Sequence, residues 1–195
     1  MTKKRVKMNY DLHSVVGIDE AGRGALAGPL LVAGCLLHTQ IAGIKDSKEL
    51  SAKKRAELFA LIKEHSNYLI LNFSHTQIDE MGLSWCLKTA LIIIKHHFKG
   101  FSFLYDGNTN FGVADISTLI KADRKVLQVG AASILAKVSR DTVMSALDES
   151  FAEYGFAKHK GYASKAHINV IAKFGLSHIH RKSFKLKCFE KGLFE

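Results

Sequence analysis

Short apolar runs alternate along this chain with longer segments of helical periodicity, and together they predict its secondary structure. Five runs have the length of strands buried in a sheet; they lie at residues 15–18, 30–37, 68–73, 101–105 and 126–129. Four segments repeat apolar residues near helical spacing, as on one side of an α-helix; they lie at residues 51–65, 76–99, 131–151 and 164–174. Because strands and helices alternate, the predicted fold class is α/β.

The connections between these elements predict a mixed sheet. Only a tight turn separates the first two runs, so these strands are expected to be antiparallel, whereas a helix follows the second run. Ser51 is expected to cap the helix that follows it, and Thr76 with Asp79 is expected to form a capping box at the next helix. The length suits a single unit, in which we expect a body over residues 11–156 and a small basic helical lobe over residues 157–195.

The net charge of +10 is concentrated at the two ends of the chain. The first ten residues contain Lys3, Lys4, Arg5 and Lys7 but no acid, and residues 157–195 contain many more basic than acidic residues. The middle of the chain is close to neutral. This distribution favours a polyanionic partner, such as a nucleic acid, held at the periphery of the fold. A basic protein without such a partner can have the same composition, so charge alone does not separate the two interpretations.

Cysteine content and hydropathy bear on where the protein acts. Cys35, Cys86 and Cys188 are far apart and form no paired metal-binding spacing, which indicates a reducing compartment. No apolar run reaches the length of a membrane span, and the basic N-terminal segment is not followed by the apolar stretch of a signal peptide. We therefore expect a cytoplasmic protein that does not enter a membrane.

Candidate chemistry is concentrated where apolar runs meet acidic residues. Asp19 and Glu20 follow the first run, Asp106 follows the fourth, and Asp123 precedes the fifth. Acids from several strand ends can converge along one edge of a sheet, where they repel one another unless divalent cations bind among them. Carboxylates without a nearby histidine or cysteine favour Mg²⁺ or Mn²⁺ over Zn²⁺. Two such ions can clamp a phosphodiester for attack by water.

Two structural alternatives stand beside this metal site. Each acid on its own can be a solvated residue at a strand end, and residues 19–24 can form a polar hairpin turn. Neighbouring strand residues also point to opposite faces, so Asp19 and Glu20 are expected to share one site only if the strand ends or bulges there. Gly22 and Gly24 favour such a bulge, and they would also let a phosphate or sugar approach the backbone closely.

The motifs of the sequence closely resemble those of bacterial ribonuclease HII, a type 2 ribonuclease H, in the same order and over nearly the whole chain. The most specific is GIDEAGRG at residues 17–24, followed by Gly28-Pro29. The others are DSK at 46–48, DGN at 106–108, KAD at 121–123, AASILAKVSRD at 131–141, HKGYASKAH at 159–167 and HRKSF at 180–184. Departures from the family pattern, including the loss of two prolines that is expected to loosen the lobe, occur at Ala122, Ala163, Ser164 and Leu186.

The resemblance implies an RNase H-like fold, with a mixed five-stranded sheet flanked by helices and a small C-terminal helical lobe. It implies an endonuclease that hydrolyses RNA in RNA–DNA hybrids and cuts on the 5′ side of ribonucleotides embedded in duplex DNA. The chemistry would use two metal ions and leave 3′-hydroxyl and 5′-phosphate ends. Such an enzyme would remove ribonucleotides from DNA and take part in primer removal.

The resemblance also assigns site residues, position by position. The catalytic and metal-binding acids would be Asp19, Glu20, Asp106 and Asp123, with Mg²⁺ or Mn²⁺ as the cofactor. The residues that would sense the ribose 2′-hydroxyl, the group that distinguishes RNA from DNA, are Gly22, Arg23 and Gly24. Tyr162 would pack on the neighbouring deoxyribose. The residues that would contact backbone phosphates without reading sequence are Lys48, Ser133, Lys137 and Arg140.

The last expectations concern partners and competing functions. The C-terminal sequence CFEKGLFE, residues 188–195, can dock on a replication sliding clamp, as in some relatives, or pack on its own lobe. The protein is expected to act on nucleic acid as a monomer. Two other functions stay open on the residues alone: a hybrid-binding protein without catalysis, and another RNase H-like nuclease, such as a resolvase or integrase, that does not need a 2′-hydroxyl.

Overall fold

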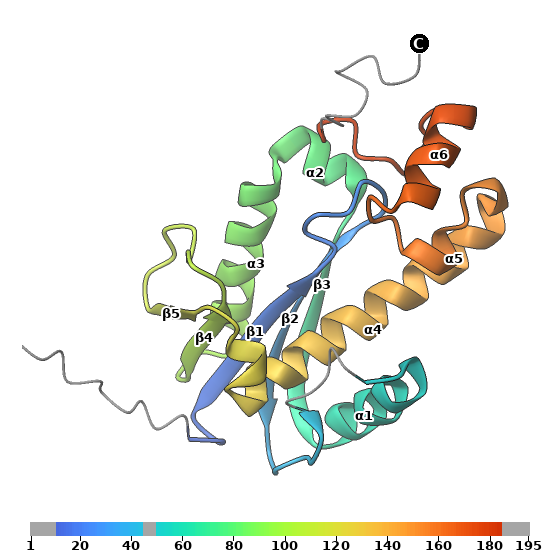
Figure 1. Cartoon of the computed structure of the whole chain (residues 1–195). Coiled ribbons are helices and arrows are strands. Elements are labelled where there is room, and N and C mark those ends of the chain that lie inside the picture. Colours follow the sequence, from blue (N-terminus) through green and yellow to red (C-terminus); the bar gives the residue numbers. More distant parts are fainter. Residues whose placement is uncertain (1–10, 45–49, 185–195) are drawn as a thin grey trace, which may run out of the picture.

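A mixed β-sheet of five strands lies at the centre of the structure, a computed structural model that describes residues 11–44 and 50–184 (Figure 1). The strands are β1 (Val15–Ala21), β2 (Leu30–Leu37), β3 (Ser66–Phe73), β4 (Ser102–Asp106) and β5 (Ile116–Leu119). Their order across the sheet is β3-β2-β1-β4-β5. The β1–β2 and β2–β3 pairs are antiparallel, and the β1–β4 and β4–β5 pairs are parallel. The predicted mixed sheet is confirmed.

Helices connect β2 to β3 and β3 to β4, and further helices follow β5. The α-helices are α1 (Ala52–Glu64), α2 (His75–Met81), α3 (Leu83–His97), α4 (Leu127–Ser150), α5 (Phe156–His159) and α6 (Lys165–Phe174), with 3-10 helices η2 (Ala122–Arg124) and η3 (Ala152–Tyr154). Ser51 caps α1 as predicted, because its side chain accepts a hydrogen bond of 3.2 Å from the N–H of Lys54. Among the residues that the structure describes, no helix has the length and apolar character needed to cross a membrane.

The helices cover both faces of the sheet (Figure 1). On one face, α2 and α3 pack on apolar side chains of β1 and β2, in a cluster that includes Val16 and Ile94. On the other face, α1 and α4 pack on the opposite side chains of the same strands, in a cluster that includes Ala33, Leu58 and Ala132. The alternation of β-strand side chains therefore divides the core into two layers.

Helix α4 lies very close to β1 because a glycine stands at the contact. A Cβ atom on Gly17 would lie 2.2 Å from main-chain atoms of Gln128 and Val129, so no larger residue fits. This close approach brings Ser133, one turn further along α4, to the same pocket as Asp19 on β1. The sheet and this long helix together position the polar residues described below.

The helix predicted over residues 76–99 is two helices in the structure. Gly82 separates α2 from α3 and has a φ of 85°, which a residue with a side chain rarely adopts. The capping box also differs from the prediction, because Ser74 and Gln77 form it, two residues earlier than the predicted pair. The prediction of helical structure in this segment was therefore correct, but the helix boundaries and the capping residues were wrong.

The apolar run at residues 126–129 is the beginning of α4 and its N-cap rather than a strand. Val126 and Val129 are buried in a cluster with Val15 and Leu104. A short apolar run buried in a helix cannot be told from a strand by periodicity alone. The fifth strand is β5, an edge strand of four residues with mixed polarity, which has no strong periodic signal.

A small lobe of η3, α5 and α6 packs at the far end of α4 (Figure 1). Its apolar cluster contains Ala27, Met144, Tyr154, Phe156 and Ile179. Because Ala27 belongs to the loop between β1 and β2, the lobe packs directly on that loop. The loop that follows β1 is therefore shaped partly by the lobe.

Candidate active site

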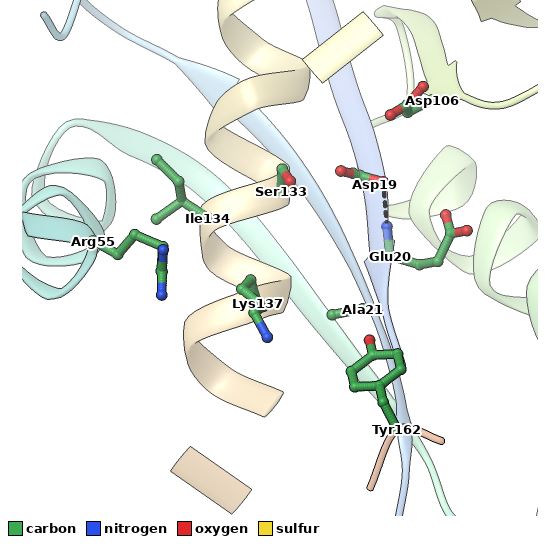
Figure 2. Close-up of a pocket in the computed structure, with 9 residues that line it drawn as sticks. All are labelled: Asp19, Glu20, Ala21, Arg55, Asp106, Ser133, Ile134, Lys137 and Tyr162. Carbon is green, nitrogen blue, oxygen red and sulfur yellow. Dashed lines mark hydrogen bonds between the residues drawn. The ribbon is translucent and has the colours of Figure 1, made fainter. Parts of the chain in front are cut away.

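A pocket of about 450 Å³ opens beside the C-terminal half of β1, between the sheet and α4 (Figure 2). The residues that line it are Asp19, Glu20, Ala21, Arg55, Asp106, Ser133, Ile134, Lys137 and Tyr162. The acids come from β1 and β4, whereas the two basic residues come from α1 and α4. The pocket therefore has an acidic side and a basic side.

Three of the four predicted acids converge in this region. Asp19, Asp106 and Asp123 each offer one carboxylate oxygen, and these oxygens lie within 4.8 Å of one another. The parallel pairing of β1 with β4 brings the first two acids side by side. The third comes from η2, which is tied to the end of β4 because Asp106 Oδ1 accepts a hydrogen bond of 3.1 Å from the N–H of Ala122.

Glu20 lines the same pocket from the other face of β1. The strand continues in regular register to Ala21, so it neither ends nor bulges at Asp19 and Glu20 as we expected. The two side chains leave β1 in different directions (Figure 2). Glu20 is held by the hydroxyl of Tyr105, which donates to its Oε2 at 2.7 Å, and by Arg23, whose Nη1 lies 3.5 Å from its Oε1. Glu20 therefore stands at the edge of the acid triad.

Burial makes the ionised form of these carboxylates costly. It raises the pKa of Asp19 well above its usual value, and the neighbouring Glu20 adds to the increase, while hydrogen bonds from Ser133 and from the Glu20 N–H oppose it. Burial also raises the pKa of Glu20, against hydrogen bonds from Tyr105 and Arg23. A divalent cation would remove much of this cost, because it favours the ionised carboxylates.

The donor atoms fit a hard divalent cation. The acid triad offers carboxylate oxygens only, and no histidine or cysteine is among the residues that line the pocket. Mg²⁺ and Mn²⁺ prefer such oxygen ligands, whereas Zn²⁺ is more often bound by nitrogen and sulfur. The acid triad therefore has the donor atoms with which it could hold such an ion.

The loop after β1 presents its backbone beside these acids. Gly22 has a φ of 92°, and its N–H donates a hydrogen bond of 3.0 Å to the hydroxyl oxygen of Tyr162. A Cβ atom on Gly22 would lie 2.1 Å from Arg140 Nε and 2.6 Å from the Pro29 oxygen, so the fold itself requires glycine there. Gly24 differs, because a Cβ atom at that position would meet no atom within 4 Å. Packing therefore explains the first glycine and not the second.

Arg140, a predicted phosphate contact, lies where the loop after β1 meets the lobe. Its side chain is fully buried. It donates hydrogen bonds to the carbonyl oxygens of Pro29 at 2.8 Å, Lys160 at 2.8 Å and Ala27 at 3.1 Å. The guanidinium therefore joins the loop after β1 to the lobe.

A second buried arginine, Arg181, acts on the same loop. Its Nε donates to the carbonyl oxygen of Gly28 at 3.0 Å, and its Nη1 donates to that of Arg23 at 3.1 Å. Burial, with the nearby charge of Arg140, lowers its pKa to about 10, so it stays charged at neutral pH. Arg181 belongs to the HRKSF motif, from which no role was predicted for it.

The other predicted phosphate contacts have varied surroundings. Ser133 lines the pocket and its side chain hydrogen-bonds the carboxylate of Asp19, so it orients an acid. Lys137 also lines the pocket, and its Nζ donates to Asp141 Oδ1 at 2.8 Å. Lys48 lies outside the described residues. The structure therefore brings two of the four predicted contacts, Ser133 and Lys137, to the pocket.

Two further residues, one that lines the pocket and one that holds Glu20, had no predicted role. Arg55 is partly buried, lines the pocket and donates to the carbonyl oxygen of Leu50. Tyr105 was assigned only to an apolar strand, yet its hydroxyl holds Glu20. A basic residue in the first turn of a helix has no distinctive signal, whereas a tyrosine directly before a candidate catalytic acid is a signal that could have been used.

The sequence matches one family of known proteins over most of its length. The profile of Ribonuclease HII matches residues 16–187. The ribonuclease HII of Campylobacter concisus is 59% identical over 173 residues, which are 89% of this chain and 94% of that protein. The similarity therefore extends over the strands, the acids and the lobe.

Solved structures with the same fold come from the same enzyme type. The RNase HII of Archaeoglobus fulgidus, solved in a complex with PCNA, has a TM-score of 0.77 at 30% identity, with 89% of this chain and 96% of that chain covered. The ribonuclease H2 of Pyrococcus horikoshii has a TM-score of 0.73 at 25% identity, with 88% and 94% covered. The expected RNase H-like fold is confirmed.

Proposed function

This chain belongs to the ribonuclease HII family, and we propose that it hydrolyses RNA in RNA–DNA hybrids and cuts on the 5′ side of ribonucleotides embedded in duplex DNA. Its family makes it a type 2 ribonuclease H, a nuclease that acts on nucleic acid. The proposed products carry 3′-hydroxyl and 5′-phosphate ends. The proposed cellular tasks are the removal of ribonucleotides from DNA and of primers during replication.

The observation that carries this proposal is the acid triad beside the loop after β1, where the backbone at Gly24 borders open space. The triad oxygens lie within 4.8 Å of one another, and a Cβ atom on Gly24 would meet nothing within 4 Å. The 2′-hydroxyl is the group by which a protein distinguishes RNA from DNA. Gly22, Arg23 and Gly24 are the proposed sensors of this hydroxyl, because their backbone lies beside the acids.

The proposed cofactor is Mg²⁺ or Mn²⁺, in a reaction that uses two ions. The ribonuclease H family depends on divalent metal, and the residues that would hold it are Asp19, Glu20, Asp106 and Asp123. When bound, divalent cations stabilise the charge that develops during in-line displacement at a phosphodiester. The chain's own contribution is to orient the carboxylates, through Ser133 at Asp19 and Tyr105 at Glu20.

The basic side of the pocket is the proposed site of phosphate contacts. Lys137 and Arg55 line the pocket from two different helices, α4 and α1 (Figure 2). Contacts of this kind fix the position of a duplex without reading its sequence. Lys48 stays a proposed contact from the resemblance, and Arg55 is added to the set because of where its side chain lies.

Tyr162 is the proposed contact to the deoxyribose next to the ribonucleotide. Its ring lines the pocket, and its hydroxyl accepts the N–H of Gly22 at 3.0 Å. This hydrogen bond links the proposed sugar contact to the proposed hydroxyl sensor. The two parts would therefore recognise the junction between ribose and deoxyribose together.

A sliding clamp is the proposed protein partner, and the proposed state of the enzyme is a monomer. The Archaeoglobus fulgidus RNase HII was solved in a complex with PCNA. In this chain the candidate segment, residues 188–195, lies outside the described residues. Its removal should abolish co-elution with a purified bacterial clamp in size-exclusion chromatography and leave the cleavage of short duplexes unchanged. Retained co-elution would contradict this assignment.

The test of the proposed activity is a cleavage assay on three duplexes of one sequence, in Mg²⁺ and in Mn²⁺. The duplexes are all DNA, DNA with one ribonucleotide, and an RNA–DNA hybrid. We expect one cut on the 5′ side of the single ribonucleotide, several cuts in the hybrid, and none in the DNA. Cleavage of the all-DNA duplex would favour another RNase H-like nuclease. Salt-sensitive binding without cleavage in either metal would favour a hybrid-binding protein.

A further inference from the structure

Three histidines, two of them buried, form a cluster in the C-terminal lobe, apart from the acids. His167 and His180 are fully buried, and their Nε2 atoms lie 3.0 Å apart. The ring of His159 stacks on that of His167, with ring centroids 4.1 Å apart. None of the three lines the catalytic pocket, so the proposed chemistry does not account for them.

The hydrogen-bond partners determine which ring nitrogen carries the hydrogen. Nδ1 of His167 lies 2.9 Å from the carbonyl oxygen of Tyr162, which can only accept, so this Nδ1 carries a hydrogen. Nδ1 of His180 accepts the N–H of Ser177 at 2.8 Å, so the hydrogen of a neutral His180 is on Nε2. That Nε2–H then donates to the bare Nε2 of His167. The chain of donors runs from Ser177 through both rings to Tyr162.

Both rings must be neutral for this chain of hydrogen bonds to form. A second proton on His167 would place two N–H groups opposite each other at 3.0 Å. Burial lowers the pKa of both rings to about 4. The groups packed around them are the rings of Tyr154, Phe156 and His159. These surroundings favour the neutral forms.

The donor chain ends on a residue that faces the catalytic pocket. The carbonyl oxygen of Tyr162 accepts from His167 and also from the N–H of Ser164, at 2.7 Å. The hydroxyl of the same Tyr162 accepts from Gly22. Tyr162 is therefore held at its backbone by the lobe and at its side chain by the glycine loop.

We propose that His167 and His180 are positioning residues, whose directional hydrogen-bond chain sets where Tyr162 presents its ring to the sugar beside a ribonucleotide. The role of Tyr162 in this statement rests on the proposed function, whereas the donor chain is a property of the folded protein. Neither histidine touches the substrate. Positioning of this kind matters, because a displacement of about 1 Å can cost roughly 100-fold in rate.

The donor chain is tested without substrate, by ¹⁵N NMR of the imidazole rings in the full-length protein at neutral pH. We expect hydrogen on Nδ1 of His167 and on Nε2 of His180, which are opposite tautomers. The exposed His178 is the internal reference and should show averaged tautomers. The same tautomer in both buried rings, or a charged ring, would overturn the proposal. This measurement tests the hydrogen-bond chain even if the protein cleaves none of the three duplexes.

The positioning role is tested by steady-state kinetics on the single-ribonucleotide duplex and on the hybrid. His167→Leu removes the donor to Tyr162 and should lower kcat on the single ribonucleotide by roughly 10- to 100-fold, with a smaller loss on the hybrid. His167→Asn keeps an amide donor near the place of Nδ1 and should recover most of the loss. His178→Ala is the matched control and should leave both activities unchanged. Equal losses on both substrates would contradict a role at the junction.

A double-mutant cycle separates positioning from a general loss of structure. If His167 acts through Tyr162, adding His167→Leu to Tyr162→Ala should change the rate little further. Circular dichroism on each variant establishes that the enzyme compared is folded. Losses that multiply in the folded double variant would show that His167 acts on another group and would overturn the proposal.

Discussion

The hydroxyl of Tyr105 donates a hydrogen bond to Oε2 of Glu20, and 2.7 Å separate the two oxygens although the residues lie 85 positions apart in the chain. Tyr105 is fully buried on β4, the parallel neighbour of β1. The bond favours the ionised form of a carboxylate whose burial raises its pKa. A core residue therefore opposes the effect of burial on a candidate metal ligand.

Replacement of this tyrosine should weaken the cation site. In Tyr105→Phe the Mg²⁺ concentration for half-maximal cleavage should rise about fivefold, because one hydrogen bond to a carboxylate contributes about 1 kcal/mol. The measurement is the cleavage rate as a function of Mg²⁺ concentration. Tyr68→Phe, on β3, is the control and should behave as wild type. An unchanged Mg²⁺ dependence in Tyr105→Phe would contradict the role assigned to its hydroxyl.

Neutralising the buried carboxylate of Asp19 should separate stability from activity. Asp19→Asn should abolish cleavage, and without cations it should be slightly more stable than wild type, because the cost of a buried charge is removed. Mg²⁺ should raise the thermal midpoint of wild type and not that of the variant. Thermal unfolding with and without Mg²⁺ measures both effects. Equal stabilisation of the two proteins by Mg²⁺ would show that Asp19 is not a ligand.

The two glycines of the loop should respond differently to alanine. Gly22→Ala should destabilise the fold by about 2 kcal/mol or more, because its Cβ atom would overlap Arg140 and its φ is 92°. Gly24→Ala has room for its Cβ atom, so urea unfolding should match wild type while cleavage falls because the methyl group obstructs the sugar. Wild-type cleavage by Gly24→Ala would remove this glycine from the proposed sensor.

Two basic residues on α4 should have opposite effects. Arg140→Met leaves three backbone carbonyls without their donor and should cost about 3 kcal/mol in urea unfolding. Lys137→Ala should change the free energy of unfolding by less than about 0.5 kcal/mol. A plot of log affinity for a duplex against log salt concentration should become less steep by about one, because one phosphate contact is lost. Unchanged stability together with a weaker salt dependence of duplex binding in Arg140→Met would instead support a phosphate contact by Arg140.

Stability should depend on pH through the buried histidines. Burial lowers the pKa of His167 and of His180 to about 4, so the unfolded chain, with a histidine pKa of about 6.5, binds protons that the folded one does not. The contribution of these two histidines to the free energy of unfolding is complete above a pH of about 6.5. It is lost as the pH falls towards 4. Asp19 and Glu20, whose pKa values are raised, act in the opposite direction.

The measurement is therefore a comparison of variants rather than of absolute midpoints. Thermal midpoints between pH of about 7.5 and 4.5 should fall less steeply in His167→Asn than in wild type. His178→Ala, at an exposed position in the same lobe, should retain the wild-type slope. Identical slopes in all three proteins would mean that the buried ring does not titrate as its surroundings require.

Local patterns predicted much of the fold and several parts of the site. The apolar runs at 30–37 and 68–73 are strands, and the segment at 164–174 is a helix, because burial imposes a periodicity that the residues themselves carry. Boundaries were less certain, since the break at Gly82 depends on one backbone angle. The run at 126–129 was assigned wrongly because a short buried run has the same composition in a strand and in a helix.

By itself the sequence determined the order of the motifs and the family, and it named four candidate acids, because these are properties of residue type and spacing. Only the tertiary structure decided that Asp19 and Glu20 leave an unbroken strand in different directions. Only it decided that Arg140 serves the fold while Arg55 faces the pocket. The physical reason is that a charged side chain takes its role from the partners that distant segments bring to it, and spacing along the chain does not specify them.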